Sequence, residues 1–359
     1  MCALKRLPVR SLASGAKLDI PVYTIKGCNP HAKRAYIQSS MHGSEVQGNA
    51  VIAALLEVFG QTPPEGDVVL VPNANPFAIN QKSAEYTLGR FDPTTGENWN
   101  RNYWLPTTRV TQRPAWKTLQ RKVWAQMASA IRARLEDNLS FGERLALKLQ
   151  LLTIGADYVI DLHCANISAR HLYAPQYAEA CARYFQIPLM LSIPNDFGGA
   201  MDESVSCAWW TFWHELQAQG YPDLPPRREL PQGYTLELGG HEVISRDAAK
   251  RDAAGVVNFL RHKGIVAGRA QKPKSGFVCS LQDYKTIYSR HAGHVDFTAT
   301  LGSCVAKGGL LAQTLQFGRT ASWQPTLAEE SCIPVLHHSS AVIHEGSELM
   351  KVFTKVRKV

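Results

Sequence analysis

The sequence predicts an α/β sandwich domain followed by a small all-β domain. Up to residue 265, short apolar runs alternate with segments of helical periodicity, which is typical of strands and helices packed in layers. After a Gly-, Lys- and Pro-containing stretch at 264–276, helical periodicity disappears and short β-prone runs alternate with glycine turns. We therefore expect two domains, at 1–265 and 266–359.

The first elements form a β–α–β unit. A strand is expected at 34–40, a helix at 45–59 and a second strand at 67–73. This order favours parallel pairing of the two strands through a right-handed crossover. The polar segment 75–108 that follows predicts a long loop, and long loops inside compact domains usually carry function.

The alternation continues to the end of the first domain. We expect helices at 115–136, 141–153, 176–186, 202–219 and 246–262, and strands at 158–164, 171–175 and 233–240. The run YVIDLHC at 158–164 has the continuous apolar character of a strand that is buried on both faces of a sheet.

The composition excludes several classes of protein. Hydrophobic residues make up 45% of the 359 residues, which is too high a share for a disordered chain. No apolar run approaches the roughly 20 residues of a membrane-spanning helix, so we expect no membrane association. The N-terminal segment lacks the apolar core of a secretory signal, and the eight cysteines include no CxxC pair. These features predict a cytoplasmic protein with mostly buried thiols.

The net charge of +9 arises from 39 basic and 30 acidic residues. The basic residues are scattered and no nucleic-acid-binding motif occurs, so we expect no nucleic-acid partner. Such a surface attracts small anions instead. The sequence also lacks GxSxG, GxGxxG and Walker A motifs, which leaves nucleophile-elbow serine hydrolases and nucleotide chemistry without support.

The strongest chemical signal is HGSE at 42–45, where a predicted strand gives way to a helix. Ligands of open α/β sheets bind outside the carboxyl ends of strands. His42 and Glu45 are three residues apart, so a turn can bring both side chains onto one ion. Zn²⁺ suits an imidazole and a carboxylate.

A catalytic zinc site needs a third protein ligand and one open position. His163 is the candidate, because it lies at the end of the buried strand 158–164. Asp161 precedes it by two residues and therefore lies on the same strand face. We expect Asp161 to orient a ligating histidine.

Glu237 lies near the end of the predicted strand GYTLELGG, where burying a carboxylate is costly without a partner. A zinc-bound water would be such a partner. Glu237 could take a proton from that water and pass it to a leaving amine. In the segment GENWNRNY, Arg101 could bind a substrate carboxylate through its planar fork, and Asn100 could share it. Arg90 could polarise the scissile carbonyl.

Each of these residues also has a purely structural interpretation. Glu237 could cap a helix or pair with an arginine, and Arg90 and Arg101 could be solvated surface residues. The sequence assigns His214 and His241 to the core or the surface. We do not expect the histidines at 337, 338 and 344 to form a second metal site.

Together the motifs resemble the succinylglutamate desuccinylase/aspartoacylase family, within the zinc carboxypeptidase superfamily. HGSE matches the His-x-x-Glu zinc motif, IDLHC the segment of the third ligand, and TLELGG the segment of the catalytic glutamate. NPFAIN, Arg90 and NWNRNY resemble the substrate-binding stretch. The resemblance implies one Zn²⁺ per chain and the following site residues: His42, Glu45 and His163 as ligands, Glu237 as the base, Arg90 at the carbonyl, and Asn100 and Arg101 at the substrate.

The resemblance also implies an α/β/α sandwich of the zinc-carboxypeptidase type, with a mixed central sheet. It implies a C-terminal lipoyl-like β-barrel, for which GSCVAKGGLLAQ is the clearest segment. One segment departs from the family, because desuccinylases commonly show Asp-Leu-Asn-Arg where this chain has Asn98-Trp99-Asn100-Arg101. NRNY is closer to the carboxypeptidase form.

We therefore expect a zinc-dependent hydrolase that cleaves the amide bond of an N-acyl amino acid or a similar small carboxylate. The alternative with the same chemistry is a metallocarboxypeptidase acting on short peptides, which NRNY favours. The alternative of another class is a zinc-retaining binding protein without turnover, and an intact Glu237 argues against it. An exposed strand edge in the β domain would allow a homo-oligomer.

Overall fold

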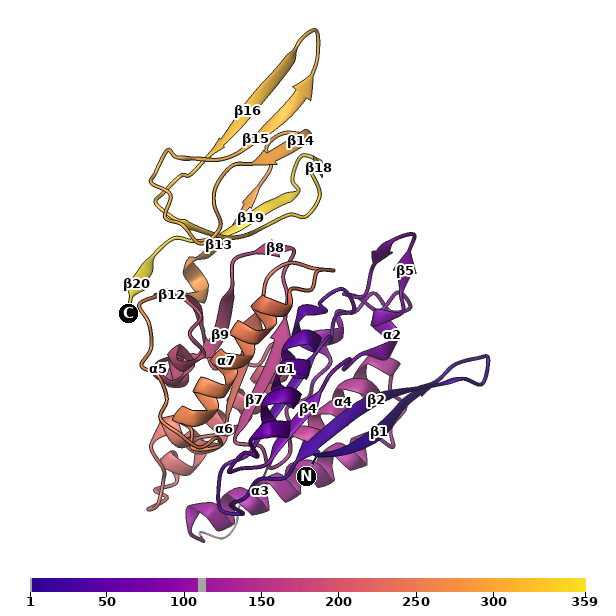
Figure 1. The fold of residues 1–359 in the computed structure, drawn as a ribbon, viewed down its shortest axis with the longest axis vertical. Helices are drawn as coiled ribbons and strands as arrows, with labels where there is room; N and C mark the ends of the chain where they lie inside the picture. The colour runs from indigo at the N-terminus through magenta and orange to yellow at the C-terminus, as the bar shows by residue number, and fades with distance from the viewer. Residues whose placement is uncertain (1, 109–113) are drawn as a thin grey trace.

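The computed structural model describes residues 2–108 and 114–359. A ten-stranded sheet crosses the molecule in the order β1–β2–β4–β3–β7–β11–β9–β10–β12–β20. Strands β4, β3, β7 and β11 are parallel neighbours, whereas β11 pairs antiparallel with β9. Helices cover the sheet (Figure 1), which confirms the expected α/β/α sandwich with a mixed central sheet.

The strands of this sheet are β1 (Cys2–Ser11), β2 (Lys17–Ile25), β3 (Ala35–Ser39), β4 (Val68–Val71), β7 (Tyr158–His163), β9 (His171–Pro175), β10 (Leu189–Ile193), β11 (Gln232–Glu237), β12 (Phe277–Ser280) and β20 (Val356–Lys358). The helices are α1 (Gln47–Gln61), α2 (Pro76–Ile79), α3 (Trp116–Arg134), α4 (Phe141–Thr153), α5 (Glu179–Ala182), α6 (Met201–Ala218) and α7 (Arg246–His262). Among the described residues, no helix is long and apolar enough to cross a bilayer.

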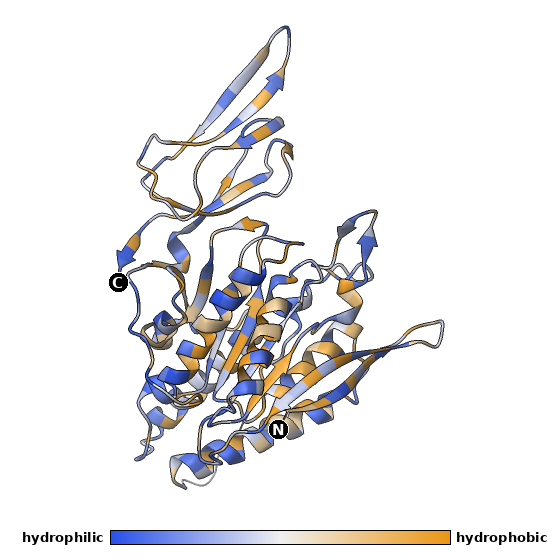
Figure 2. Cartoon of the chain, viewed as in Figure 1, coloured by the Kyte–Doolittle hydropathy of each residue, from blue (hydrophilic) through white to orange (hydrophobic). Residues whose placement is uncertain are grey.

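Successive residues of the central strands face opposite sides of the sheet, so each strand serves two cores. Val68 and Leu70 of β4 pack in the core with α1 and α7, which lie side by side (Figure 1). Val69 and Val71 pack in the core with α3, α4 and α6. Figure 2 shows the resulting concentration of apolar residues along the central strands.

Several segments differ from the sequence-based expectation, among them strand β10 and helix α2, neither of which we predicted. Strands β1 and β2 form a hairpin at the sheet edge that we did not predict, although Leu18, Ile20 and Val22 alternate with the period of a half-buried strand. The helix expected at 176–186 is broken into η2 (Gln176–Ala178), α5 and η3 (Arg183–Phe185). The last turn ends where Gln186 takes a left-handed conformation with φ 60°.

A small β unit is inserted between β12 and β20. Its strands are β13 (Tyr284–Tyr288), β14 (Gly293–Phe297), β15 (Leu310–Phe317), β16 (Ala321–Leu327), β17 (Ile333–His337), β18 (Val342–Ile343) and β19 (Glu348–Phe353). Together with β8 (Ile167–Ser168) from the α/β part, these strands form two four-stranded antiparallel sheets. The expected all-β C-terminal unit is therefore present.

The small β unit and the large sheet share a buried core. Leu191 of β10 and Cys279 of β12 pack with Val335 and Phe353 of the small unit. The strands β12 and β20 lie beyond residue 265 but pair with the large sheet or with each other at its edge. The division of the chain into folding units at residue 265 stays a prediction.

Candidate metal centre and active site

Three parallel strands bring the predicted site residues together. Strand β3 pairs with β7, and β7 pairs with β11, so their carboxyl ends are neighbours. The loop after β3 carries His42 and Glu45. His163 is the last residue of β7, and Glu237 is the last residue of β11, directly opposite His163 in the register.

The loop after β3 is held in a tight turn. Ser40 takes a left-handed conformation with φ 58°, and its hydroxyl donates to the Glu45 carbonyl at 3.0 Å. Gly43 packs against α2 so closely that a Cβ atom would lie 2.2 Å from the Ala78 carbonyl oxygen. Only glycine therefore fits at position 43 without moving the backbone.

Three residues that could hold a metal ion, His42, Glu45 and His163, form a cluster that we call the metal-binding group. Glu45 lies between the two imidazoles, with Oε1 2.8 Å from His42 Nδ1 and Oε2 2.6 Å from His163 Nδ1. One potential ligand atom of each residue lies within 4.8 Å of the others, and all three residues are buried. No other such group of three or more acidic, histidine or cysteine side chains occurs in the described part of the chain.

The hydrogen bonds around His42 fit a cation at this place. Its Nδ1 faces the Glu45 carboxylate and its Nε2 faces Asn98 Oδ1 at 2.8 Å, so both ring nitrogens meet oxygen acceptors. A neutral imidazole has only one N–H to donate. A cation on the Nδ1 side would satisfy that nitrogen and Glu45 together, and Zn²⁺ suits two imidazoles and a carboxylate.

The pKa values show how strongly these groups interact without a cation. Burial lowers the pKa of His42. Burial also opposes protonation of His163, but the charges of Asp161 and Glu45 outweigh it and raise its pKa well above the usual value. For Glu45, burial is outweighed by the two imidazoles, which hold its pKa well below the usual range. The metal-free site thus favours positive charge beside Glu45.

Asp161 lies behind His163, inside the sheet. Its Oδ2 is 2.9 Å from His163 Nε2, and its Oδ1 accepts a hydrogen bond from Gln38 Nε2 at 3.0 Å. Both Asp161 and Gln38 are completely buried. This arrangement leaves Nδ1 as the nitrogen of His163 that faces Glu45, as expected for a histidine oriented by a carboxylate.

Glu237 has the properties of a proton acceptor. Its Oε2 is buried and has no hydrogen-bond partner among the described residues. Burial and the charge of Glu45 raise its pKa to about 7, while His163 and Arg90 oppose the increase. A carboxylate with a pKa near neutrality is suited to general acid–base catalysis.

The predicted substrate-binding residues lie at different depths. The Nη1 of Arg90 is 3.3 Å from Glu45 Oε1, and about half of its side chain is exposed. Asn100 is buried in η1 (Trp99–Arg101), with Nδ2 3.2 Å from His163 Nε2. Arg101 is exposed, and its guanidinium donates to the backbone carbonyl of Asn100 at 2.7 Å. The site therefore includes Arg90 and Asn100 directly, while Arg101 folds back on its own loop.

Two residues of the site were missed by the sequence analysis. Asn98 accepts a hydrogen bond from His42, and the motif NWNRNY that contains it was assigned through Asn100 and Arg101 alone. His241, expected to be structural or on the surface, lies with Nε2 3.6 Å from Glu45 Oε1 and 3.1 Å from the Cys164 carbonyl. Its position four residues after Glu237 is the signal that could have identified it.

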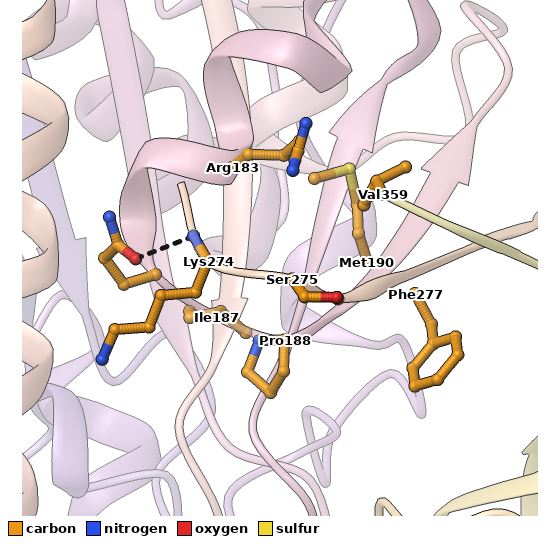
Figure 3. Close-up of a pocket in the computed structure, with 10 residues that line it drawn as sticks. Arg183, Ile187, Pro188, Met190, Lys274, Ser275, Phe277 and Val359 are labelled. Carbon is orange, nitrogen blue, oxygen red and sulfur yellow. Dashed lines mark hydrogen bonds between the residues drawn. The ribbon is translucent and has the colours of Figure 1, made fainter. Parts of the chain in front are cut away.

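A separate pocket of about 170 Å³ lies beside β10 and β12 (Figure 3). It is lined by two cationic residues, Arg183 and Lys274, together with apolar side chains such as Met190 and Phe277. The backbone N–H of Lys274 donates to Gln186 at 3.3 Å. None of the predicted site residues lines it, so it is distinct from the metal-binding group.

Comparison with known proteins agrees with this geometry. Two solved structures of proteins described as succinylglutamate desuccinylase/aspartoacylase are similar over the whole chain. That from Shewanella frigidimarina is 37% identical with a TM-score of 0.94, covering 99% of this chain and 98% of its own. That from Shewanella amazonensis is 38% identical with a TM-score of 0.93, covering 99% and 100%.

A curated relative from Halomonas elongata, N-alpha-acetyl-L-2,4-diaminobutyric acid deacetylase, is 24% identical over 88% of this chain and 80% of its own length. The family model of the succinylglutamate desuccinylase/aspartoacylase catalytic domain matches residues 31–263, which include every predicted site residue. With its buried His-Glu-His group at the carboxyl edge of the sheet, the chain belongs to the succinylglutamate desuccinylase/aspartoacylase family.

Proposed function

We propose that this protein is a zinc-dependent hydrolase that releases the amine from an N-acyl amino acid or a similar small carboxylate. The observation that carries the proposal is the register of β11 on β7, which sets Glu237 opposite His163. A carboxyl group with one unpartnered oxygen and a pKa of about 7 thus adjoins the buried His42, Glu45 and His163.

In this proposal His42, Glu45 and His163 hold one Zn²⁺, which when bound would act as a Lewis acid and activate a water molecule. Glu237 takes a proton from the attacking water because its carboxylate has a free oxygen and adjoins His163 at the end of the neighbouring strand. Glu237 then passes the proton to the leaving amine. In the site without a cation, burial raises the pKa of Glu237 to about 7, so this carboxyl can both accept and donate a proton near neutral pH.

Arg90 supplies positive charge beside Glu45, and Arg101 can join it by releasing the Asn100 carbonyl to which its guanidinium donates. Arg90 is held near Glu45 and is half exposed, so its guanidinium can turn to the carbonyl oxygen of the scissile bond. Arg101 has an exposed planar fork that suits bidentate binding of a substrate carboxylate. Asn100, which is buried between His163 and the start of α6, is proposed to fix the floor of the substrate site.

The choice of substrate class is supported by the family and by the charge of the protein. The Halomonas elongata relative is named for removing an acetyl group from an α-amino group, which is an amide hydrolysis. A net charge of +9 attracts anionic substrates such as N-acyl amino acids.

The test is amine release by the zinc-loaded protein from a panel of N-acetyl, N-succinyl and longer N-acyl amino acids, beside dipeptides and tripeptides. Glu237→Gln serves as the blank. Release from acyl amino acids that the variant lacks would support the proposal. Release from peptides alone would indicate a carboxypeptidase, and zinc binding without any release would indicate a binding protein; either result contradicts the proposal.

A further inference from the structure

The two histidines of the metal-binding group have different partners on their outer nitrogens. His163 Nε2 faces a carboxylate, Asp161 Oδ2, at 2.9 Å. His42 Nε2 faces a neutral amide, Asn98 Oδ1, at 2.8 Å. The outer partner of a ligating histidine fixes its tautomer and tunes the metal, so this difference has chemical consequences.

The orientation of the Asn98 amide is fixed by a second contact. Its Oδ1 also accepts the backbone N–H of Asn100 at 2.9 Å, which only an oxygen can do. The oxygen, not the amide nitrogen, therefore points at His42. A ring that donates from Nε2 to this oxygen keeps its lone pair on Nδ1, the nitrogen that faces Glu45.

We propose that Asn98 is a positioning residue of the metal site. It holds His42 in the tautomer that binds through Nδ1. As an amide, it also limits the negative charge around the cation to that of Glu45, Asp161 and Glu237. An aspartate at this position would make the same hydrogen bond and bring a further negative charge, which would bind the cation more tightly and reduce its power to withdraw electrons.

The inference rests on the proposed zinc site, and two substitutions test it. Asn98→Asp keeps an acceptor for both His42 and the backbone of Asn100, so it preserves the local structure of η1. Asn98→Ala removes both contacts. Asn29→Asp is the control for added charge alone, because Asn29 is exposed and its Oδ1 accepts the backbone N–H of His31 at 2.9 Å, a contact that aspartate keeps.

The measurement is the dissociation constant of Zn²⁺ for each metal-free protein, by competition with a chromophoric chelator at one pH, with circular dichroism to verify folding. We expect binding at least tenfold weaker in Asn98→Ala and about tenfold tighter in Asn98→Asp, with Asn29→Asp within threefold of the unchanged chain. If Asn98→Ala does not fold, the result for Asn98→Asp decides.

The inference is overturned if Asn98→Ala binds zinc within threefold of the unchanged chain, or if Asn98→Asp binds no more tightly. A purely structural role for Asn98 predicts the second result, because aspartate preserves the cap of η1. If the unchanged chain itself does not bind zinc, the proposed metal site fails as well, so the two failures can be told apart.

Discussion

Two regions of the molecule differ in the residues that they bury. The edge of the large sheet that carries the site buries polar residues, whereas the β15–β16 hairpin of the small β unit exposes apolar ones. At the edge, His42, Glu45 and His163 are each no more than 3% exposed. On the hairpin, which projects from the molecule in Figure 1, Phe317 is 73% exposed and Trp323 51%. Buried charged groups are costly unless they bind something, so the edge indicates chemistry.

The two regions should therefore differ in how strongly a substitution changes stability or binding. Removing one buried charged partner leaves the others unpaired, which costs several kcal/mol or abolishes binding. Removing an exposed apolar side chain that contacts little should cost less than about 0.5 kcal/mol. The site and the small unit should therefore respond very differently to single substitutions, and the following predictions test this contrast.

The largest effect is expected from His163→Ala, compared with His337→Ala in the small β unit. His163 supplies one of the three potential ligand atoms, whereas His337 bonds to the backbone of His338 and stacks on Phe297. We expect His163→Ala to lose its zinc, measured by elemental analysis, and all amine release above background. Equal zinc content in the two variants would remove the distinction between the regions.

The next effect concerns the stability of the metal-free protein. The pKa of Glu237 rises from 4.5 in the unfolded chain to about 7 in the folded protein, so folding favours its protonated form. Below pH 4.5 both states are protonated and this group adds no penalty. Between pH 4.5 and about 7 the folded state loses stability as pH rises.

Glu237→Gln lacks this penalty. We expect the metal-free variant to be more stable than the unchanged chain by about 3 kcal/mol at pH 8, at about 1.4 kcal/mol per pKa unit, and equally stable near pH 4. Urea unfolding with the metal removed by a chelator measures both. A variant that is less stable at pH 8 would show that Glu237 stabilises the fold through contacts that glutamine cannot replace.

Arg90→Ala is expected to lower kcat/KM about 100-fold, as for the loss of one donor to a developing oxyanion. The matched control is Arg183→Ala, which removes an arginine from the pocket in Figure 3. Steady-state kinetics on the best substrate of the panel should leave the control within twofold. Equal losses in both variants would assign Arg90 to the fold or to the general charge of the protein.

The smallest effect is expected on the β15–β16 hairpin. Phe317→Ser combined with Trp323→Ser should change the free energy of unfolding by less than about 0.5 kcal/mol per site and kcat/KM by less than twofold. Urea unfolding and amine release measure these values. A large loss of activity would mean that the hairpin takes part in the site, and the contrast between the two regions would then be wrong.

The fold could be predicted because its central strands have a distinctive pattern. Segments such as YVIDLHC are buried on both faces and therefore apolar throughout, whereas helix α7 shows one apolar stripe. The hairpin of β1 and β2 was missed because an edge strand is only half buried and its alternation is weak. The prediction of one continuous helix at 176–186 was wrong, because short turns and a short helix share the same periodicity.

The metal-binding group could be predicted because His42 and Glu45 share one turn and His163 ends a recognisable strand. Asn98 could not, because only the tertiary structure brings it to the site, whereas His241 was overlooked although it follows Glu237 by four residues. Asn98 lies 56 residues from its partner His42, and His241 reaches Glu45 across the sheet. The inward or outward direction of Arg101 depends on the path of one loop, which no sequence pattern specifies.

We expect one cation to bind between the two imidazoles and Glu45. Crystals grown with Zn²⁺ can test it by anomalous diffraction recorded on both sides of the zinc absorption edge. We predict one anomalous peak per chain, from an ion bound by Nδ1 of His42, Nδ1 of His163 and the Glu45 carboxylate. A peak elsewhere, such as at His337 and His338, or none at these three residues, would contradict it.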